Sequence, residues 1–375
     1  MHPAPCAPAK RDNAAQFSQT VKAMPASTTS EQDDLFGEPA SPPNEARRRE
    51  PSTASAAALL PAAVDAQVQA VADELRVRFA GRLHLGTSSW SFPGWAGIVW
   101  GREYSESMLS RRGLFAYAAH PLLRTVSLDR SFYRPLERAT YAALAAQVPV
   151  DFRFVVKAAA LVTDATLRDP DTGKGLQPNP HFLDPDTALR ECVEPARDGL
   201  GDRLGVLVFQ LPPWPAAWLK NVPALHERLE ALWLRVVPAL PPSARVAVEL
   251  RDPSLLTPGL AQLLKRCGVR PCVGLHDRMP AVAEQLPMLR AAWPGDFVCR
   301  WNLQRGLRYA EAKGLWEPFD RLQAPDPATR EALARVIVGT LAAGFSAFVT
   351  INNKAEGSAP LSVLELAREV LRQSA

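Results

Sequence analysis

The alternation of short apolar runs with longer helical stretches constrains the fold of this 375-residue chain more than any other feature. Strands that are connected through helices pair in parallel, and eight of them close into a barrel without edge strands. We therefore predict an α/β fold, a TIM-type (β/α)8 barrel. The predicted strands cover residues 83–87, 125–130, 152–157, 205–210, 245–251, 271–275, 297–301 and 347–351.

Helical periodicity fills the segments between these runs, and several of the predicted helices begin with a proline, which the first turn of a helix tolerates. The predicted helices cover residues 64–79, 105–119, 136–147, 185–196, 215–237, 258–267, 278–292, 330–343 and 360–372. An open, doubly wound sheet is the alternative fold. Against it, the first strand is followed by Thr87-Ser-Ser-Trp90 and not by a Gly-x-Gly-x-x-Gly turn.

The first 60 residues differ in composition from the rest. They contain eight of the 35 prolines and only two aromatic residues, so they offer too little apolar surface to offset the entropy of ordering. We predict a disordered Pro/Ala/Ser-rich tail over residues 1–60 and a single barrel domain over residues 61–375.

Charge and cysteine content exclude several classes of protein. A formal net charge of +4 is small for this length and does not predict an obligate nucleic-acid binder. The five cysteines form no Cys-x-x-Cys pair, which argues against a zinc cage and a disulfide framework. No run of 18 apolar residues occurs, so no membrane span is expected. We predict a cytoplasmic protein.

The period-2 alternation of strand side chains predicts that four charged residues point into the barrel. In the run 245–251, Glu249 and Arg251 share the face opposite three apolar residues, so both point into the barrel mouth. The same rule turns Lys157 and Arg300 inward. We predict Glu249 and Lys157 as catalytic residues, with Glu249 as an acid/base group or ligand, and Lys157, Arg251 and Arg300 as the groups that hold phosphate or carboxylate oxygens. The alternative is a salt-bridge network that only plugs the barrel.

Further polar and aromatic residues lie where strands end, and we predict that they bind substrate: Tyr133, Gln210, Asn352, Asn353 and Trp90. The two asparagines could instead form an Asx turn, and the loop of Trp90 could be a lid that packs on the barrel. His276 and Asp277 lack the spacing of a metal site, so no metal is predicted. The sequence leaves any cofactor unknown.

A short motif in the tail points to a protein partner. Gln32, Leu35 and Phe36 fit the Gln-x-x-Leu-Phe pattern of peptides that dock on the bacterial sliding clamp. In such a peptide, two apolar side chains fill a pocket and the glutamine bonds at its rim. This motif predicts an association with the DNA replication machinery.

Several segments, taken in order, resemble the YecE-like proteins, known as domain of unknown function 72. The segments are Leu-Gly-Thr-Ser-Ser-Trp-Ser-Phe-Pro-Gly-Trp at 85–95, Ser-Phe-Tyr at 131–133, Phe-Arg-Phe-Val-Val-Lys at 152–157, Leu-Gly-Val-Leu-Val-Phe-Gln-Leu-Pro-Pro at 204–213, Val-Ala-Val-Glu-Leu-Arg at 246–251 and Asn-Asn at 352–353. The resemblance implies a TIM-type barrel and no particular activity.

The chain departs from the family pattern at three places. It reads Ser127-Leu-Asp129 where the family usually has Glu, a hydrophobic residue and Asn. It has Asp164 and Asp252 where the family often has His. If the family's chemistry needs those groups, this chain has lost or changed it.

Three functions remain open from the sequence. The one that the converging charges favour is an enzyme of hydrolase or isomerase type that acts on an anionic or polyhydroxylated small molecule. The second is a DNA-associated protein, either nuclease-like or recruited to the sliding clamp through its tail. The third is a non-catalytic scaffold barrel.

Overall fold

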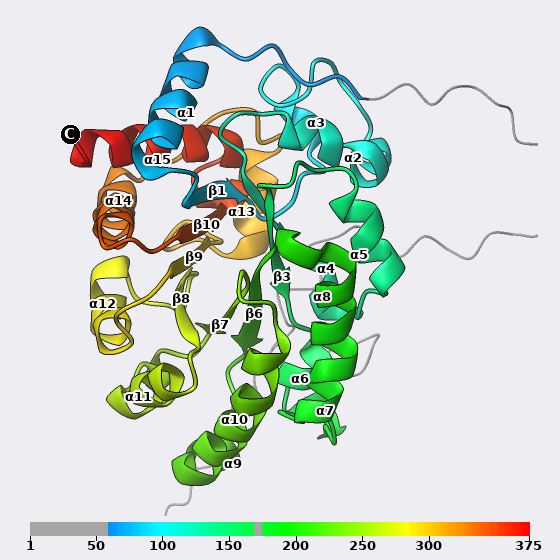
Figure 1. The fold of residues 1–375 in the computed structure, drawn as a ribbon, viewed down its shortest axis with the longest axis vertical. Helices are drawn as coiled ribbons and strands as arrows, with labels where there is room; N and C mark the ends of the chain where they lie inside the picture. Colours follow the sequence, from blue (N-terminus) through cyan, green and yellow to red (C-terminus); the bar gives the residue numbers. More distant parts are fainter. Residues whose placement is uncertain (1–58, 169–174) are drawn as a thin grey trace, which may run out of the picture.

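The computed structural model describes residues 59–168 and 175–375, and Figure 1 shows their fold. Eight parallel strands form a closed barrel in the order β1-β10-β9-β8-β7-β6-β3-β2, and β1 pairs with both β10 and β2. The barrel strands are β1 (Leu83–Thr87), β2 (Thr125–Leu128), β3 (Arg153–Lys157), β6 (Leu204–Leu211), β7 (Arg245–Leu250), β8 (Arg270–Leu275), β9 (Phe297–Trp301) and β10 (Ala347–Ile351). The predicted fold and all eight predicted strands are confirmed.

Helices surround the barrel (Figure 1). The longer ones are α1 (Ala66–Phe79), α2 (Glu106–Arg112), α5 (Arg138–Ala145), α8 (Glu194–Leu200), α10 (Val222–Val236), α11 (Pro258–Arg266), α12 (Val282–Ala291), α14 (Pro327–Ala342) and α15 (Ala359–Gln373). Side-chain caps begin several of them, as when Asp326 and Thr257 accept backbone N–H groups at the starts of α14 and α11.

Some predicted helices are divided in the structure. The helix predicted over 105–119 ends at Arg112 and resumes as α3 (Leu114–Ala118), with Gly113 between the two. The helix predicted over 185–196 begins as α7 (Pro185–Ala188) and reaches α8 through a wider π-helical turn. The helix predicted over 215–237 is α9 (Ala216–Leu219) followed by α10, whose cap is Asn221.

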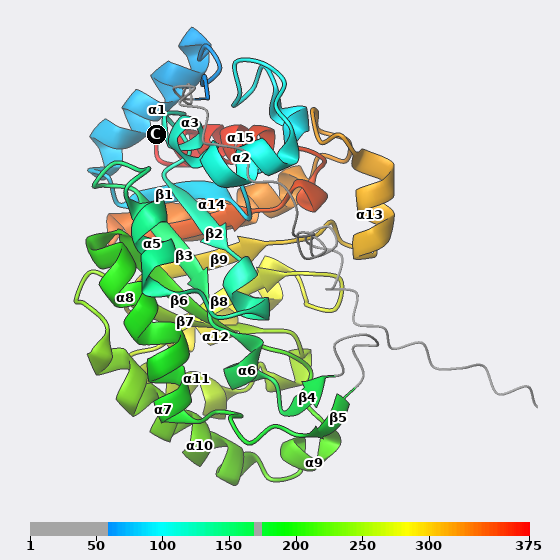
Figure 2. The same ribbon diagram turned by 90° about the vertical axis from the view of Figure 1, so that its right-hand side faces the viewer.

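Short elements that the sequence does not predict lie on the side where the strands end. They are α4 (Arg130–Tyr133), α6 (Ala160–Thr163), α13 (Tyr309–Trp316) and an antiparallel pair, β4 (Thr166–Arg168) with β5 (Gly175–Pro178). Figure 2 shows α13 and the β4–β5 pair on the same side of the barrel. Four of these five elements have only three or four residues, too few to show a periodicity in the sequence, whereas α13 has eight.

Two apolar layers hold the barrel together. The interior is filled by Val155, Val206, Val208, Ala247, Cys272, Val298 and Phe348. The alternate residues of the same strands, such as Phe154 and Val246, belong to the larger core beneath the helices. Each large apolar side chain buried in this way contributes about 1.5–3 kcal/mol to folding. The alternation that predicts which residues face the interior is therefore confirmed along β3, β7 and β9.

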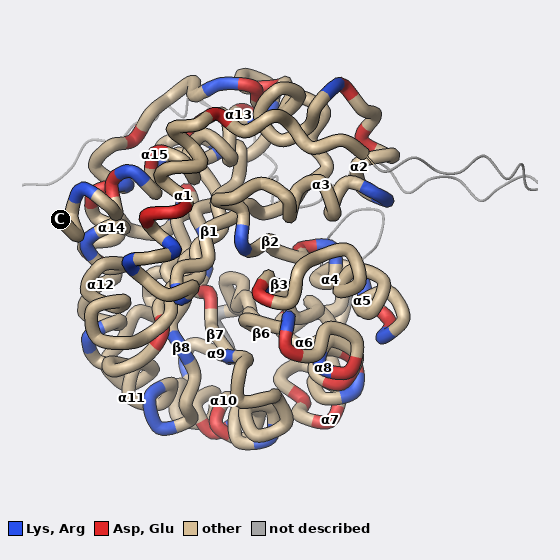
Figure 3. The backbone as a smooth tube through the Cα atoms, turned by 45° about the horizontal axis from the view of Figure 1, so that its top comes forward, with Lys and Arg blue, Asp and Glu red and all other residues tan. Residues whose placement is uncertain are grey.

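None of the described helices is both long enough and apolar enough to cross a membrane. In the view of Figure 3, Lys and Arg positions are interspersed with Asp and Glu positions on the surrounding helices.

Candidate functional site

Charged side chains gather where four barrel strands end. Lys157 is the last residue of β3, and Glu249 and Arg300 are the second-last residues of β7 and β9. Their exposed fractions are 3%, 0% and 1%. Arg251 and Asp129, which directly follow β7 and β2, are also buried. The ends of parallel strands meet at one end of a barrel. We call these five residues the mouth cluster.

Arg300 joins two carboxylates that come from different parts of the barrel. Its Nη2 lies 2.6 Å from each carboxylate oxygen of Asp129, and its Nη1 donates to Oε2 of Glu249. Burial alone would lower the pKa of Arg300, but the charges of Asp129 and Glu249 outweigh it and raise the pKa above its usual value. The guanidinium therefore stays charged and ties β9 to β2 and β7.

Glu249 is held as a permanent anion. Its Oε1 forms an ion pair with Nη2 of Arg251 at 2.8 Å and accepts a hydrogen bond from Nδ2 of Asn302 at 3.1 Å. Burial raises the pKa of Glu249, but Arg251, Arg300 and Lys157 together lower it to about 2. A carboxylate with such a pKa releases and takes up no proton near pH 7. The geometry thus favours Glu249 as an anchor for two arginines over the acid/base role that the sequence predicts.

A glycine on β8 lets Glu249 reach Arg300. Gly274 pairs with Arg300, and β8 lies between β7 and β9 in the barrel. A Cβ atom on Gly274 would lie 3.1 Å from Cγ and 3.3 Å from Oε1 of Glu249. Because those contacts are tighter than ordinary van der Waals separation, a side chain at this position would displace the carboxylate.

Lys157 is the charged residue of the mouth cluster that has no ion-pair partner. Within the described residues no carboxylate oxygen lies within 4.0 Å of its ammonium, which sits 3.8 Å from the centroid of the Phe132 ring. Burial lowers the pKa of Lys157 to about 7, because the raising effect of Asp129 is smaller and Arg300 and Arg251 lower it further. The ammonium therefore loses its proton much more readily than that of an exposed lysine.

The charge balance of the cluster leads to the same conclusion. Asp129 and Glu249 supply two negative charges, which Arg251 and Arg300 neutralise through direct contacts. A proton on Lys157 adds a third positive charge to a buried group that is already balanced. Burying an uncompensated charge is costly, and a lysine avoids the cost by losing its proton.

Gln210 extends the cluster across β6. Its Oε1 accepts a hydrogen bond from Nη2 of Arg251 at 2.9 Å, and its side chain is fully buried. Gln210 and the mouth cluster contain three of the buried nitrogen atoms that have no hydrogen-bond partner among the described residues: Nε2 of Gln210, Nε of Arg251 and Nε of Arg300. Buried donors without partners are rare and destabilising, so they are the groups that a bound acceptor would satisfy.

The two asparagines after β10 are occupied locally. Oδ1 of Asn352 accepts the backbone N–H of Lys354 at 3.0 Å, which is an Asx turn. Oδ1 of Asn353 accepts from the Trp95 indole at 3.2 Å and from the backbone of Ala359 at 2.8 Å, at the start of α15. The structure therefore directs Asn353 toward Trp95 and α15, and does not bring it to the mouth cluster.

The two aromatic residues of the prediction lie beside the cluster. Trp90 is buried and donates its indole N–H to the carbonyl of Leu109 at 3.1 Å, and the guanidinium of Arg130 lies 5.9 Å from its ring centroid. Tyr133 is 42% exposed and packs edge to face on Phe132, with 5.4 Å between the ring centroids. Trp90 is thus held against Leu109 of α2, and Tyr133 packs against the same ring that Lys157 contacts.

The prediction omits Asp129, Asn302 and Phe132. The alternation that selects Arg300 also carries Asn302, two residues later on the same face. It likewise places Ser127 and Asp129 on one face of β2, and the Ser127 hydroxyl donates to Oδ1 of Asp129 at 2.6 Å. Where the family pattern has Glu at the Ser127 position, this chain supplies its carboxylate two residues farther toward the mouth.

Metal ligation finds no support in the described ranges, because they contain no group of three or more His, Cys, Asp or Glu side chains that could hold an ion. His276 pairs with the carboxylate of Asp277. Burial, together with the charge of Arg251, lowers the pKa of His276 to about 4. The clamp motif of Gln32, Leu35 and Phe36 lies outside the described residues.

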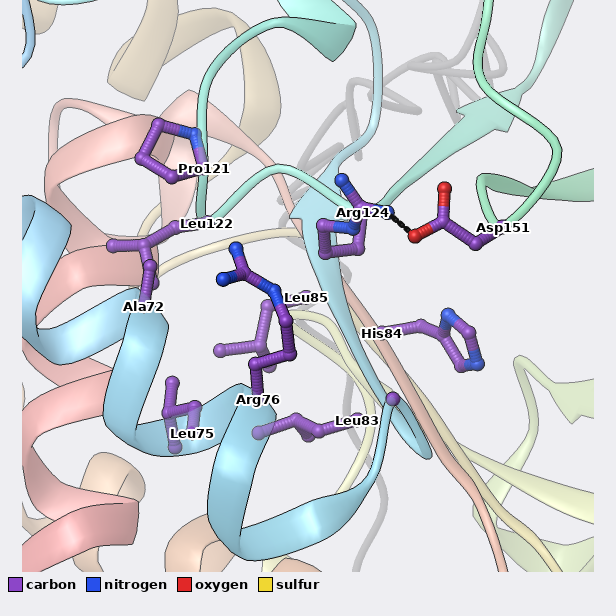
Figure 4. A pocket seen from close by; sticks show the side chains of 11 residues that line it. Ala72, Leu75, Arg76, Leu83, His84, Leu85, Pro121, Leu122, Arg124 and Asp151 are labelled. Atoms are coloured by element: carbon purple, nitrogen blue, oxygen red, sulfur yellow. Dashed lines mark hydrogen bonds and ion pairs between the residues drawn. The ribbon is translucent and has the colours of Figure 1, made fainter.

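A cavity lies at the opposite end of the barrel, between α1 and the start of β1 (Figure 4). Its volume is about 90 Å³, and most of its wall is apolar, with Arg76 and Arg124 at its edge. Arg124 pairs with Asp151 (Figure 4). Barrels of this type carry their sites where the strands end. The mouth cluster, and not this cavity, is therefore the candidate site.

Comparison with known proteins agrees with this architecture. Two solved structures of DUF72 family proteins share the fold: one from Enterococcus faecalis, with 16% identity, a TM-score of 0.51 and coverage of 77% of this chain and 95% of that one, and one from Thermotoga maritima, with 21% identity, a TM-score of 0.50 and coverage of 77% and 99%. No curated protein matches the chain. The model of the family described as "Protein of unknown function DUF72" matches residues 84–375, so this chain belongs to the DUF72 family.

Proposed function

We propose that this barrel is an enzyme that binds a small anionic or polyhydroxylated molecule at the mouth cluster and reacts with it through Lys157. The observation that carries the proposal is the buried amine of Lys157, which has no carboxylate within 4.0 Å in the described chain. A lysine with a pKa of about 7 exists in both protonation states at neutral pH. It can therefore act as a general base or as a nucleophile, as an isomerase or a hydrolase requires.

The remaining residues of the cluster divide into ligand donors and anchors. Arg251 and Gln210 each keep a buried nitrogen without a partner in the described chain, and these nitrogens suit phosphate, carboxylate or hydroxyl oxygens. Glu249 and Asp129 hold the guanidinium groups in place. Lys157 is thus the proposed catalytic residue, and Glu249 is a positioning residue.

The scaffold function competes with this proposal because Asp129, Arg300, Glu249 and Arg251 form a continuous chain of ion pairs. Such a network can serve stability alone. It does not account for Lys157, which adds charge without adding an ion pair, nor for the buried donors that the network leaves unsatisfied. We therefore prefer the enzyme.

A ligand screen tests the choice. Sugars, sugar phosphates, hydroxy acids and oxo acids are added to wild type, Arg251→Met and Lys354→Met, and binding is read as a change in melting temperature. We expect a compound that stabilises wild type and Lys354→Met but not Arg251→Met. If no compound stabilises wild type, or if Arg251→Met responds equally, the proposed function is wrong.

A further inference from the structure

Five lysines lie within the described residues, and two of them, Lys157 and Lys354, are buried. The ammonium of Lys354 lies 4.1 Å from the Tyr309 ring centroid and 5.3 Å from that of Phe319. Burial lowers the pKa of both lysines to about 7. They therefore form a natural pair, in which one amine lies beside two arginines and the other does not.

We infer that Lys157 forms an imine with the carbonyl carbon of an aldehyde or ketone that carries an acidic group, while Lys354 does not. The inference rests on the proposed function and names its substrate class. Imine formation needs an amine with a free lone pair in a desolvated place. Lys157 meets both conditions, because it lies against Phe132 and because two arginines near it oppose its protonation.

The step balances without an additional reactant. The lone pair of Nζ attacks the carbonyl carbon, and the carbonyl π electrons move to oxygen to give a carbinolamine. The two amine hydrogens leave with that oxygen as one molecule of water, and a C=N bond replaces the C=O bond. The imine nitrogen then takes a proton from water to give an iminium ion, which draws electrons from the adjacent carbon and activates its bonds.

The acidic group of the substrate follows from charge. The iminium ion carries one positive charge, which the balanced pairs of Asp129, Glu249, Arg251 and Arg300 do not neutralise. A carboxylate on the substrate restores the balance, and the free Nε atoms of Arg251 and Arg300 and Nε2 of Gln210 are donors for it. A phosphate dianion would overshoot by one charge, so a carboxylate is favoured.

Lys354 lacks these surroundings. Its neighbours are Tyr309 and Phe319, and the nearest charges that affect its pKa are Lys313 and Glu317. Within the described chain it forms no ion pair, as with Lys157, so burial and aromatic contact are matched between the two. What differs is the presence of arginine donors, which makes Lys354 an internal control for lysine reactivity.

Borohydride trapping tests the inference in the full-length chain. Wild type, Lys157→Met, Lys354→Met and Arg251→Met are each incubated with pyruvate, glyoxylate or glyceraldehyde 3-phosphate and then treated with sodium borohydride. Reduction of an imine leaves a secondary amine, which adds the mass of the carbonyl compound less one oxygen atom. Intact mass and peptide mapping then give the amount and the position of the adduct.

We expect one adduct on Lys157 in wild type and Lys354→Met, none in Lys157→Met, and at least tenfold less in Arg251→Met. Pyruvate or glyoxylate should label more than glyceraldehyde 3-phosphate; the opposite order would overturn the carboxylate preference. Adducts on Lys354 or on exposed lysines in amounts equal to Lys157 would overturn the imine assignment.

The outcome separates the two proposals because lactate, glycolate and glycerol 3-phosphate carry the same acidic groups but have no aldehyde or ketone group. If these stabilise wild type but not Arg251→Met, while no carbonyl compound is trapped on Lys157, the imine is wrong and the proposed function stands. If no carbonyl compound is trapped on Lys157 and none of the hydroxy compounds stabilises wild type, both the imine and the proposed function are wrong.

Discussion

The two ends of the barrel use arginine in opposite ways. At the starting end, an arginine stands at or directly before the first residue of six of the eight strands: Arg82, Arg124, Arg153, Arg203, Arg245 and Arg270. Most of their hydrogen bonds go to backbone carbonyls of the loops beneath the barrel, as when Arg270 donates to the carbonyls of Ala292, Pro294 and Asp296. At the mouth, Arg300 and Arg251 are buried and meet carboxylates.

The difference indicates that the arginines at the starting end stabilise the fold, whereas those at the mouth contribute little net stability. A half-buried arginine that donates to neutral carbonyls keeps part of its hydration and fastens a loop, so its contribution to folding is favourable. A fully buried arginine between two carboxylates loses its hydration, and the ion pairs only roughly repay that loss. The mouth cluster is therefore a poor device for stability, which agrees with a role in binding and reaction.

The largest effect is expected for Arg300→Met, which leaves Asp129 and Glu249 buried without their shared partner. We expect the free energy of unfolding in urea at pH 7 to fall by about 3–5 kcal/mol. Arg300→Lys keeps the charge but not the two-armed geometry of the guanidinium. Its free energy of unfolding should therefore lie between those of wild type and Arg300→Met. A loss below about 1 kcal/mol for Arg300→Met would show that the network is not the buried structure described.

Glu249→Gln should come next. The amide keeps the shape of the side chain but removes one charge, so Arg251 loses its ionised partner while Arg300 retains Asp129. We expect a loss of about 2–3 kcal/mol at pH 7. The difference from wild type should shrink as the pH falls from 4.5 toward 2. Over that range the unfolded carboxylate takes up its proton before the folded one does, and wild type loses the advantage of ionised Glu249. A difference that does not depend on pH would contradict the ionised state.

At the other end, Arg270→Ala removes three donors to loop carbonyls and should cost about 1–3 kcal/mol. Because the residue is remote from the mouth, ligand affinity and borohydride trapping should stay within twofold of wild type. Chemical denaturation and trapping on the same preparation check both. Loss of trapping in a folded Arg270→Ala protein would break the division between the two ends.

The smallest loss of stability at pH 7 is expected for Lys157→Met, which should be at least as stable as wild type, because the variant removes no ion pair and removes the cost of burying an amine that titrates near neutral pH. From pH 7 to about 10, wild type should gain stability relative to the variant by an amount on the order of a few kcal/mol. In that window the unfolded lysine still binds a proton, whereas folded Lys157 has released it. Urea denaturation at both pH values measures the gain. Lys354 is present in both proteins, so its own titration cancels from the difference in stability between them.

The sequence predicts the barrel and the inward direction of Lys157, Glu249 and Arg300, because period-2 alternation is local. It does not predict which of these groups touch. The contact of Arg300 with Asp129 joins residues 171 positions apart and depends on the closed strand order. The aromatic cover of Lys157 depends on α4, a four-residue helix without a periodic signal. The roles proposed for Glu249 and Lys157 therefore depend on contacts that only the structure gives.

The protonation of Lys157 tests the central claim most directly. The chain has eight lysines, and their side-chain carbon and nitrogen resonances can be followed by NMR as pH is raised, with Lys157→Met and Lys354→Met used for assignment. The resonance that Lys157→Met removes should titrate with a midpoint near pH 7. A midpoint near 10.5, shared with the exposed lysines, would show a permanently charged ammonium and contradict the account.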